Sequence, residues 1–193
     1  CKKPPGLSQA ETLIIRSCME KHTDLKLQFG FNHRYLSHYI LLKEIINKQI
    51  YGSPLWIRGV YGKGHDDSFF EGWRADAEIS GGGIFLDQGI HMLDLVLDLV
   101  GPLNVHNVLI DSVPDNNTID NNVFIHLRSQ DGIPVSLHSS MLQWRHRFLL
   151  EVGTENAIVS IDGIKSSTRS YGNESIRIDS HWKDNSVETQ INQ

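Results

Sequence analysis

The chain has 193 residues, a length that suits one domain, or one domain and part of another. Hydrophobic residues make up 39% of it, close to the globular average, which argues against wholesale disorder. The 18 basic and 23 acidic residues give a formal net charge of -5 without a polybasic block, so we expect neither nucleic acid nor a membrane surface as a partner. No apolar run is long enough to span a bilayer, no secretory signal is recognisable, and the two cysteines form no disulfide framework, so we expect a cytoplasmic protein.

The first predicted helix follows a turn at residues 4–6. Ser8 and Glu11 are spaced as a capping box, which predicts a helix start at this point. Apolar residues then recur at helical spacing and form one stripe, made of Ala10, Leu13, Ile14 and Cys18. Such a stripe requires a partner surface.

A strand, a second helix and a β-prone segment follow. Apolar and polar residues alternate over residues 25–31, which predicts a strand. Residues 37–48 have helical spacing, with Tyr39, Leu42, Ile45 and Ile46 predicted to face inward, and residues 55–61 are β-prone. No earlier strand is present to pair with residues 25–31, so we expect the sheet partners of this strand in a larger protein.

The second half of the chain changes from helix to strand. Residues 83–100 are the most apolar helix candidate, and Gly101-Pro102 is a strong stop signal. Short strands are predicted at residues 123–127, 135–137, 148–152, 158–161 and 175–179, with a hairpin turn at Asp131-Gly132. Early helices and late strands predict an α+β domain with a mainly antiparallel sheet.

The most specific polar cluster lies within the apolar helix. Asp87 and His91 are four residues apart, so they share one face of a helix. Apolar neighbours surround them, and burying even a neutral polar group without a partner costs roughly 2–7 kcal/mol. The pair is therefore either a structural hydrogen-bonded pair or a carboxylate that tunes a histidine for proton transfer. The glycines at 81–83 favour the second interpretation, because they allow a cofactor or substrate to approach closely.

Two other kinds of site are not predicted. The glycine-rich segments 62–64 and 81–83 lack the G-x-G-x-x-G spacing between a strand and a helix, so the chain has no dinucleotide fingerprint of its own. A metal site is not expected either, because residues 65–67 and His91 include no closely spaced pair of histidines on one face.

Three linked motifs resemble those of the Gfo/Idh/MocA oxidoreductases, which include glucose–fructose oxidoreductase and inositol dehydrogenase. The motifs are Gly30-Phe31-Asn32-His33-Arg34-Tyr35, Trp73-Arg74-Ala75-Asp76, and the segment from Ser80 to Asp94. The resemblance covers essentially the whole chain. It implies that residues 1–31 are the last helix and strand of an N-terminal Rossmann domain. Residues 32–193 would then be the C-terminal α+β domain, an open, mainly antiparallel sheet with helices on one face.

The resemblance also implies an activity: hydride transfer between NAD or NADP and a secondary alcohol of a sugar, cyclitol or nucleotide-sugar. Lys3 would be catalytic and lie near the nicotinamide. His91 would be the general base or acid, Asp87 would orient it or bind substrate, and Asp94 would support it. Further substrate contacts would come from Arg34, Trp73, Arg74 and Gln88. Lys2 stands where the family usually has glutamate, and its charge would lower the pKa of Lys3.

The implied partners are a small sugar or polyol and further copies of the chain. The cofactor would be held mainly by an N-terminal half, so we expect this part alone to be inactive. The family's sheet carries oligomer contacts on its exposed face, which implies a dimer or tetramer. The alternative is a catalytically silent oligomerisation module, or a sugar-binding module of the same fold.

Overall fold

A seven-stranded sheet forms the body of the protein, as seen in a computed structural model that describes residues 2–64, 72–112, 119–165 and 174–180. The strand order is β2-β3-β4-β1-β5-β6-β7. The strands are β1 (Pro54–Gly64), β2 (Leu103–Asp111), β3 (Asn122–Ser129), β4 (Pro134–Gln143), β5 (Arg147–Thr154), β6 (Ile158–Asp162) and β7 (Ser175–Asp179). Only β1 and β4 pair in parallel, and the other pairings are antiparallel. The predicted mainly antiparallel sheet is thus confirmed.

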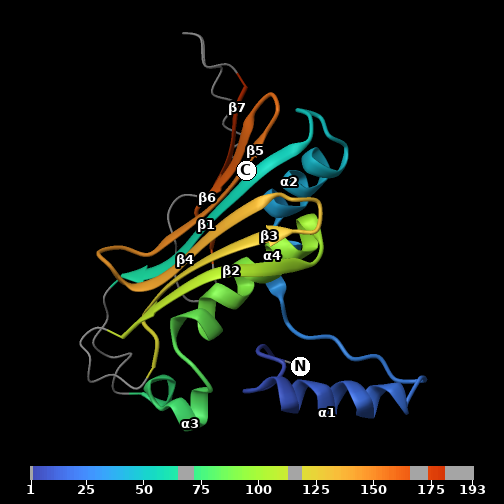
Figure 1. Ribbon diagram of the computed structural model, residues 1–193, viewed down its shortest axis with the longest axis vertical. Coiled ribbons are helices and arrows are strands. Elements are labelled where there is room, and N and C mark those ends of the chain that lie inside the picture. Colours follow the sequence, from blue (N-terminus) through green and yellow to red (C-terminus); the bar gives the residue numbers. More distant parts are fainter. Residues whose placement is uncertain (1, 65–71, 113–118, 166–173, 181–193) are drawn as a thin grey trace.

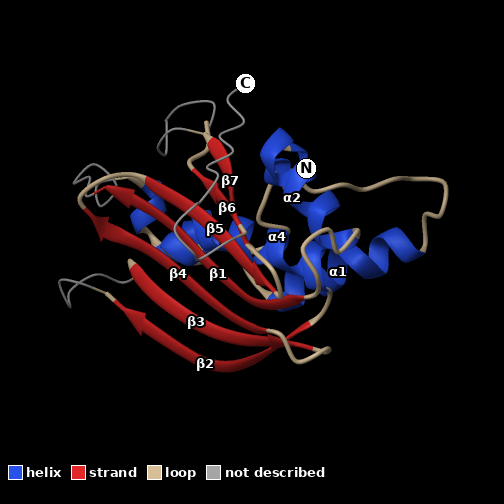
Figure 2. Ribbon diagram, turned by 90° about the horizontal axis from the view of Figure 1, so that it is seen from above, coloured by secondary structure: helices blue, strands red, loops and turns tan. Residues whose placement is uncertain are grey.

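Two helices, α2 (Ser37–Asn47) and α4 (Ile90–Val100), cover one face of this sheet (Figure 1). The opposite face carries no helix of the described chain (Figure 2). The core lies between the two layers, and its most buried members include Leu42, Ile57, Leu95 and Leu150, none more than 2% exposed. Burying one such side chain contributes about 1.5–3 kcal/mol. All four residues predicted to face inward from the second helix are buried, as the helical spacing requires.

The strands lie where the sequence predicts them, with one exception. The sequence does not predict β2. Apolar and polar residues do not alternate regularly over residues 103–111, and the pairing with β3 shifts register between Val105 and Asn107. That irregularity interrupts the period of two on which strand prediction depends. β2 is also an edge strand and mostly exposed, so its pairing with β3 defines it rather than its own hydrophobic pattern.

The N-terminal segment packs differently from the rest. Helix α1 (Gln9–Glu20) begins at the predicted capping box, where the Ser8 hydroxyl accepts a hydrogen bond from the Glu11 amide. No residue of α1 is buried, and Leu13 and Ile14 are 50% and 68% exposed. Figure 1 shows α1 apart from the sheet. The apolar stripe of α1 therefore has no partner surface in the described chain.

Residues 25–31 do not form the predicted strand. A strand exists only where its amide and carbonyl groups pair with a neighbour, and no described strand lies alongside this segment. Its alternating pattern is present, with Leu25 and Leu27 largely exposed. The prediction is wrong for the described chain because local alternation cannot supply the sheet partner. The glycine- and aspartate-rich stretch up to about Gly72, which the sequence predicts to be a loop, lies mostly outside the described residues.

Candidate functional site

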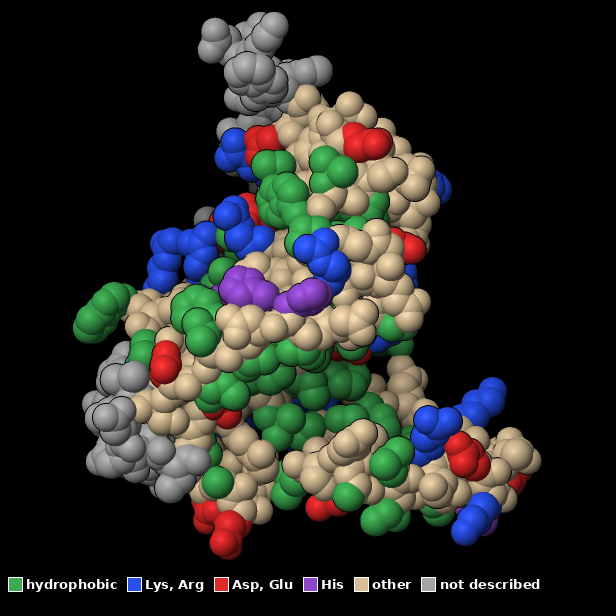
Figure 3. Space-filling model, viewed as in Figure 1, with side chains coloured by type: hydrophobic (Ala, Val, Ile, Leu, Met, Phe, Trp, Pro, Cys, Tyr) green, Lys and Arg blue, Asp and Glu red, His purple; other side chains and the backbone are tan. Residues whose placement is uncertain are grey.

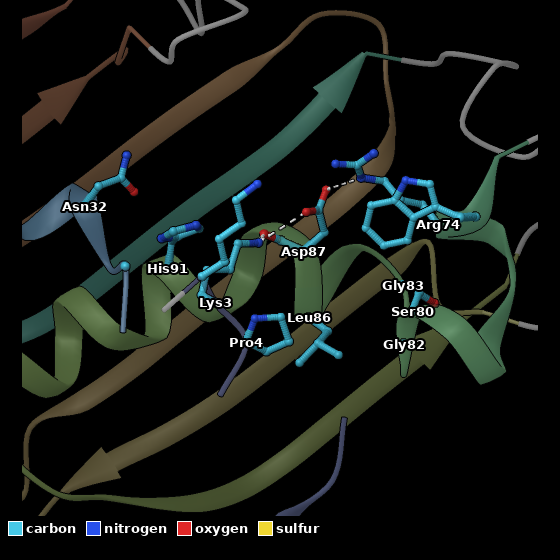
Figure 4. A pocket seen from close by; sticks show the side chains of 13 residues that line it. Lys3, Pro4, Asn32, Arg74, Ser80, Gly82, Gly83, Leu86, Asp87 and His91 are labelled. Atoms are coloured by element: carbon cyan, nitrogen blue, oxygen red, sulfur yellow. Dashed lines mark hydrogen bonds and ion pairs between the residues drawn. The ribbon is translucent and has the colours of Figure 1, made fainter. Parts of the chain in front are cut away.

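A cavity of about 520 Å³ opens where the N-terminal segment meets the helical layer (Figure 4). Its walls come from the segment before α1, the segment before α2, and the stretch that leads into α4. The lining residues are Lys2, Lys3, Pro4, Gly30, Asn32, Trp73, Arg74, Ser80, Gly82, Gly83, Leu86, Asp87 and His91. Of the eight side chains predicted for the site, Lys3, Trp73, Arg74, Asp87 and His91 line this cavity. Segments far apart in the sequence therefore meet at one hollow of a size that suits a small ligand.

Asp87 lies among three basic side chains. Its Oδ1 is 3.2 Å from the Nζ of Lys3, and its Oδ2 is 2.6 Å from the Nζ of Lys63 and 3.8 Å from the Nε of Arg74. Lys3 also donates a hydrogen bond to the main-chain carbonyl of Asp87. Figure 4 shows the carboxylate between Lys3 and Arg74. Asp87 thus holds the predicted catalytic lysine against the wall of the cavity.

The environment changes the pKa of both partners. Burial by itself would raise the pKa of Asp87, but Lys63 and Lys3 outweigh burial and the pKa is lowered. Burial lowers the pKa of Lys3, and Lys63 and Arg74 act in the same direction against the attraction of Asp87. The repulsion on Lys3 therefore comes chiefly from cations brought together by the fold rather than from Lys2. Asp87 is ionised at neutral pH, and Lys3 gives up its proton more readily than an exposed lysine.

Asp87 and His91 do not form the direct pair that an α-helix would suggest. The turn that carries Asp87, η4 (Phe85–Gly89), is π-helical, and α4 begins at the following residue. A π-helical turn contains an extra residue, which shifts the angular offset between positions four apart. The Nδ1 atom of His91 is buried and has no hydrogen-bond partner among the described residues. The Asp87 carboxylate instead forms ion pairs with Lys3, Lys63 and Arg74.

His91 is packed between two rings. His33 stacks on it with ring centroids 4.1 Å apart and planes 26° apart, and Phe31 meets it edge-on at 5.9 Å and 78°. Burial, together with the nearby charges of His33 and Lys3, lowers the pKa of His91 to about 3. The imidazole is therefore neutral at physiological pH, as a group that accepts a proton must be.

Asp94, predicted to support His91, and Arg34, predicted to contact the substrate, form an ion pair with each other. The two side chains bond to each other, with Arg34 Nε 2.7 Å from Asp94 Oδ2 and Nη2 2.6 Å from Oδ1. Arg34 also reaches Asp98, its Nη1 lying 2.9 Å from Oδ1. This two-pronged pair engages both carboxylate oxygens of Asp94 with Arg34. Neither Arg34 nor Gln88, which is 5% exposed, lines the cavity.

The glycines at 81–83 have mainly structural roles. A Cβ on Gly83 would overlap the carbonyl oxygen of Asp120, and Gly81 has a φ of +74°. Asp120 binds the start of the helical stretch: its Oδ1 accepts from the Gly83 amide at 2.7 Å and its Oδ2 from the Phe85 amide at 2.9 Å. Gly82 lines the cavity and has more space beside it. Gly83 lines the cavity as well, so two of the three glycines lie where a ligand could approach.

Four contributors to the site have no clear signal in the sequence: Asn32, His33, Lys63 and Asp120. Asn32 and His33 lie within a motif of the resemblance, but nothing in their spacing indicates a ring stack on His91. Lys63 lies in a Gly-Lys-Gly segment near the end of β1, and Asp120 lies just before β3. Their proximity to residues 83–91 results from the sheet, so no local pattern could reveal it.

Comparisons with known proteins place this architecture in one class. The levoglucosan dehydrogenase solved with NADH and L-sorbose superposes with a TM-score of 0.83 at 19% identity, over 100% of this chain and 53% of that one. A 3-ketoreductase from Actinomadura kijaniata, solved with NADP and TDP-benzene, gives 0.80 at 12% identity, over 98% of this chain and 56% of that one. At these identities the likeness shows the fold alone, a mixed open sheet with helices.

The sequence comparison then identifies the family. Residues 39–160 match the GFO/IDH/MocA C-terminal domain, and the chain belongs to this family. The glucose-6-phosphate 3-dehydrogenase of Bacillus subtilis is 33% identical over 100 residues, which are 50% of this chain and 28% of that protein. The chain therefore spans less than a third of this curated relative and about half of the solved structures.

Membrane-spanning helices and metal-ligand clusters are both absent from the residues that the structure describes. No helix there has both the length and the apolar character needed to cross a bilayer. Within the same ranges, no group of three or more His, Cys, Asp or Glu side chains is placed to hold a metal ion.

Proposed function

We propose that this chain is the substrate-side part of an NAD- or NADP-dependent oxidoreductase that acts on a secondary alcohol of a sugar, cyclitol or nucleotide-sugar. The observation that carries the proposal is the meeting of Lys3, Asp87 and His91 at one cavity. Membership of the family supports it, as do the names of the dehydrogenases to which the chain is similar.

Lys3 and His91 have different roles in this reaction. The nicotinamide cofactor, when bound, supplies the hydride chemistry, and the residues of this chain that fit its reactive end are Lys3 and Pro4 on the cavity wall. His91, which lines the same cavity as Lys3, takes the hydroxyl proton of the alcohol. The Lys3 ammonium, held by Asp87, stabilises the oxygen on which negative charge develops.

The test is an assay of the full-length protein with NAD and with NADP over a panel of sugars, sugar phosphates, cyclitols and nucleotide-sugars. We expect reduced nicotinamide to form with at least one member of the panel, and Lys3→Met to abolish most of that turnover. Full turnover in Lys3→Met would contradict the assignment of Lys3. Absence of turnover with every alcohol, by a protein shown to bind the cofactor, would contradict the proposed reaction.

We also propose that residues 1–31 belong to the dinucleotide-binding domain of the full-length protein. The apolar stripe of α1 and the exposed alternating segment 25–31 support this, since both present surface that a second domain would cover. Amide hydrogen exchange of the full-length protein tests the proposal. Strong protection of α1 is expected, and exchange at the rate of an unpacked helix would contradict it.

The open face of the sheet is proposed as the surface through which copies of the protein associate, in the cytoplasm. It contains a hollow of about 440 Å³ whose lining includes Trp56, Arg58, His126 and Arg128. Figure 3 shows histidine and basic side chains gathered on this face. Sedimentation of the full-length protein should give a dimer or tetramer, and Trp56→Glu should shift it to smaller species. A monomer at all concentrations would contradict this proposal.

A further inference from the structure

We infer that His33 is a positioning residue that fixes the ring plane of His91 in the cavity, an inference that rests on the proposed function. A catalytic histidine needs a defined ring orientation, and most obtain it from a hydrogen bond to the nitrogen that does not face the substrate. His91 has no such bond among the described residues, since its buried Nδ1 atom lacks a partner there. Some other contact must therefore orient the ring.

Ring packing is the contact that the structure offers. The near-parallel His33 ring covers one side of His91 at 4.1 Å, and Phe31 meets it at 78°. Both rings come from residues 31–33, immediately before α2, whereas His91 belongs to α4. A flat ring at this distance restricts rotation of the imidazole about its Cβ–Cγ bond, because any large rotation would drive one ring into the other. His33 can thus orient the His91 ring, which is one of the roles that a carboxylate has beside other catalytic histidines.

His33 is itself held rigidly. Its Nδ1 lies 3.1 Å from Asn32 Oδ1, and its Nε2 lies 3.2 Å from the hydroxyl of Tyr61. An amide oxygen only accepts, so Nδ1 donates to Asn32, and in the neutral ring Nε2 accepts from Tyr61. Tyr61 is 4% exposed and packs edge-on against Phe148 at 5.2 Å, deep between the layers. The sheet therefore holds His33, and His33 holds His91.

Asn32 and His33 are neighbours in one motif but have different positions relative to the cavity. Asn32 lines the cavity, whereas His33 does not line it and makes its ring contact with the site through His91. His33 is accordingly expected to affect turnover more than substrate binding. A lower kcat with an unchanged KM distinguishes His33 from residues that touch the substrate directly.

The test uses the full-length protein with three substitutions. His33→Leu fills the space without a flat ring, and we expect kcat to fall by about 10- to 100-fold with KM nearly unchanged, the size of effect that a small misplacement causes. His33→Phe restores a flat ring and should recover most of kcat. His38→Leu is the matched control, because His38 is 7% exposed against 6% for His33 but makes no stack with His91. Its kcat should stay at the unsubstituted value.

Nitrogen-15 spectra of the histidine rings provide a readout that does not depend on turnover. We expect one sharp set of His91 signals in the unsubstituted protein and in His33→Phe, and exchange-broadened signals in His33→Leu. Unchanged kcat and unchanged His91 signals in His33→Leu would overturn the inference. If the unsubstituted protein oxidises no alcohol, the proposed function fails, and the spectra still decide whether His33 orients His91.

Discussion

Two groups of ion pairs lie on the same stretch of helix, and their contrast shows how the site differs from the scaffold. Around Asp87, three basic side chains converge on one carboxylate beside a cavity. Around Asp94 and Asp98, Arg34 and Lys43 are matched by two carboxylates, and none of these four lines the cavity. Residue types are the same in both groups. The excess of positive charge and the open space beside it mark the first as the candidate site.

The second group connects structural elements. Arg34 comes from the 3₁₀ turn η1 (Asn32–Tyr35), Lys43 comes from α2, and both carboxylates come from α4. Tyr39 adds a hydrogen bond of 2.7 Å to Asp98. The hydrogen bond to Asp94 raises the pKa of Arg34 further above its already high ordinary value. These contacts connect η1, α2 and α4 away from the cavity.

The largest expected effect is on the cavity side of this comparison. His91→Ala in the full-length protein should lower kcat by about 10²–10⁴-fold, the span for removal of a general base or acid. Steady-state kinetics with saturating cofactor measures it, with the melting temperature as a check on folding. Turnover near that of the unsubstituted protein would remove His91 from the proposed mechanism.

Asp87→Asn should produce the next largest effect. The neutral amide no longer attracts the three basic side chains, so Lys3 loses the partner that positions it. We expect kcat to fall by about 10- to 100-fold with a small change in stability. Asp94→Asn is the matched control, and there the melting temperature should fall while kcat changes little. The opposite pattern would reverse the assignment of the two groups.

Arg34→Ala should act on stability. It leaves the Asp94 carboxylate, whose side chain is 11% exposed, without its charged donor. An unsatisfied group of this kind costs about 1–3 kcal/mol of unfolding free energy. Urea denaturation of the full-length protein measures the loss, and kcat should remain within about twofold, because Arg34 does not line the cavity. A large loss of turnover with unchanged stability would place Arg34 in the substrate site after all.

The last expected effect is a dependence of stability on pH. Burial, followed by the charge of Lys3, lowers the pKa of His33 to about 4 from an ordinary 6.5. Between these two values the unfolded state binds a proton that the folded state does not, so stability falls as the pH falls from 6.5 to 4. The slope from one such group reaches about 1.4 kcal/mol per pH unit. Chemical denaturation from pH 7 to pH 5 should show it, and His33→Phe should reduce it.

An equal slope in His33→Phe would show that the folded-state pKa of His33 is not depressed. His91 contributes in the same direction, because its pKa is lowered to about 3 by burial, His33 and Lys3. Asp87 does too, since its lowered pKa makes a contribution that is present at neutral pH and is lost on acidification. The substitution at His33 separates the contribution of His33 to the pH dependence of stability from the contributions of His91 and Asp87.

The sequence by itself determined the elements whose patterns are local. Helical spacing identified α2 and its inward residues, and strand alternation with glycine turns identified β3 to β7. The capping box at Ser8 and Glu11 located the start of α1. These features depend on residues a few positions apart, whose relative directions the backbone period sets.

Only the tertiary structure decided which groups meet. It paired Asp87 with Lys3 and Lys63, which are 84 and 24 residues away, and it paired Arg34 with Asp94. It also left residues 25–31 without a strand partner and stacked His33 on His91. Contacts of this kind follow from the sheet order and from a π-helical turn, neither of which has a signature in local spacing. The chemistry of an ionisable side chain depends on those distant neighbours, because burial and nearby charge set its pKa and its orientation.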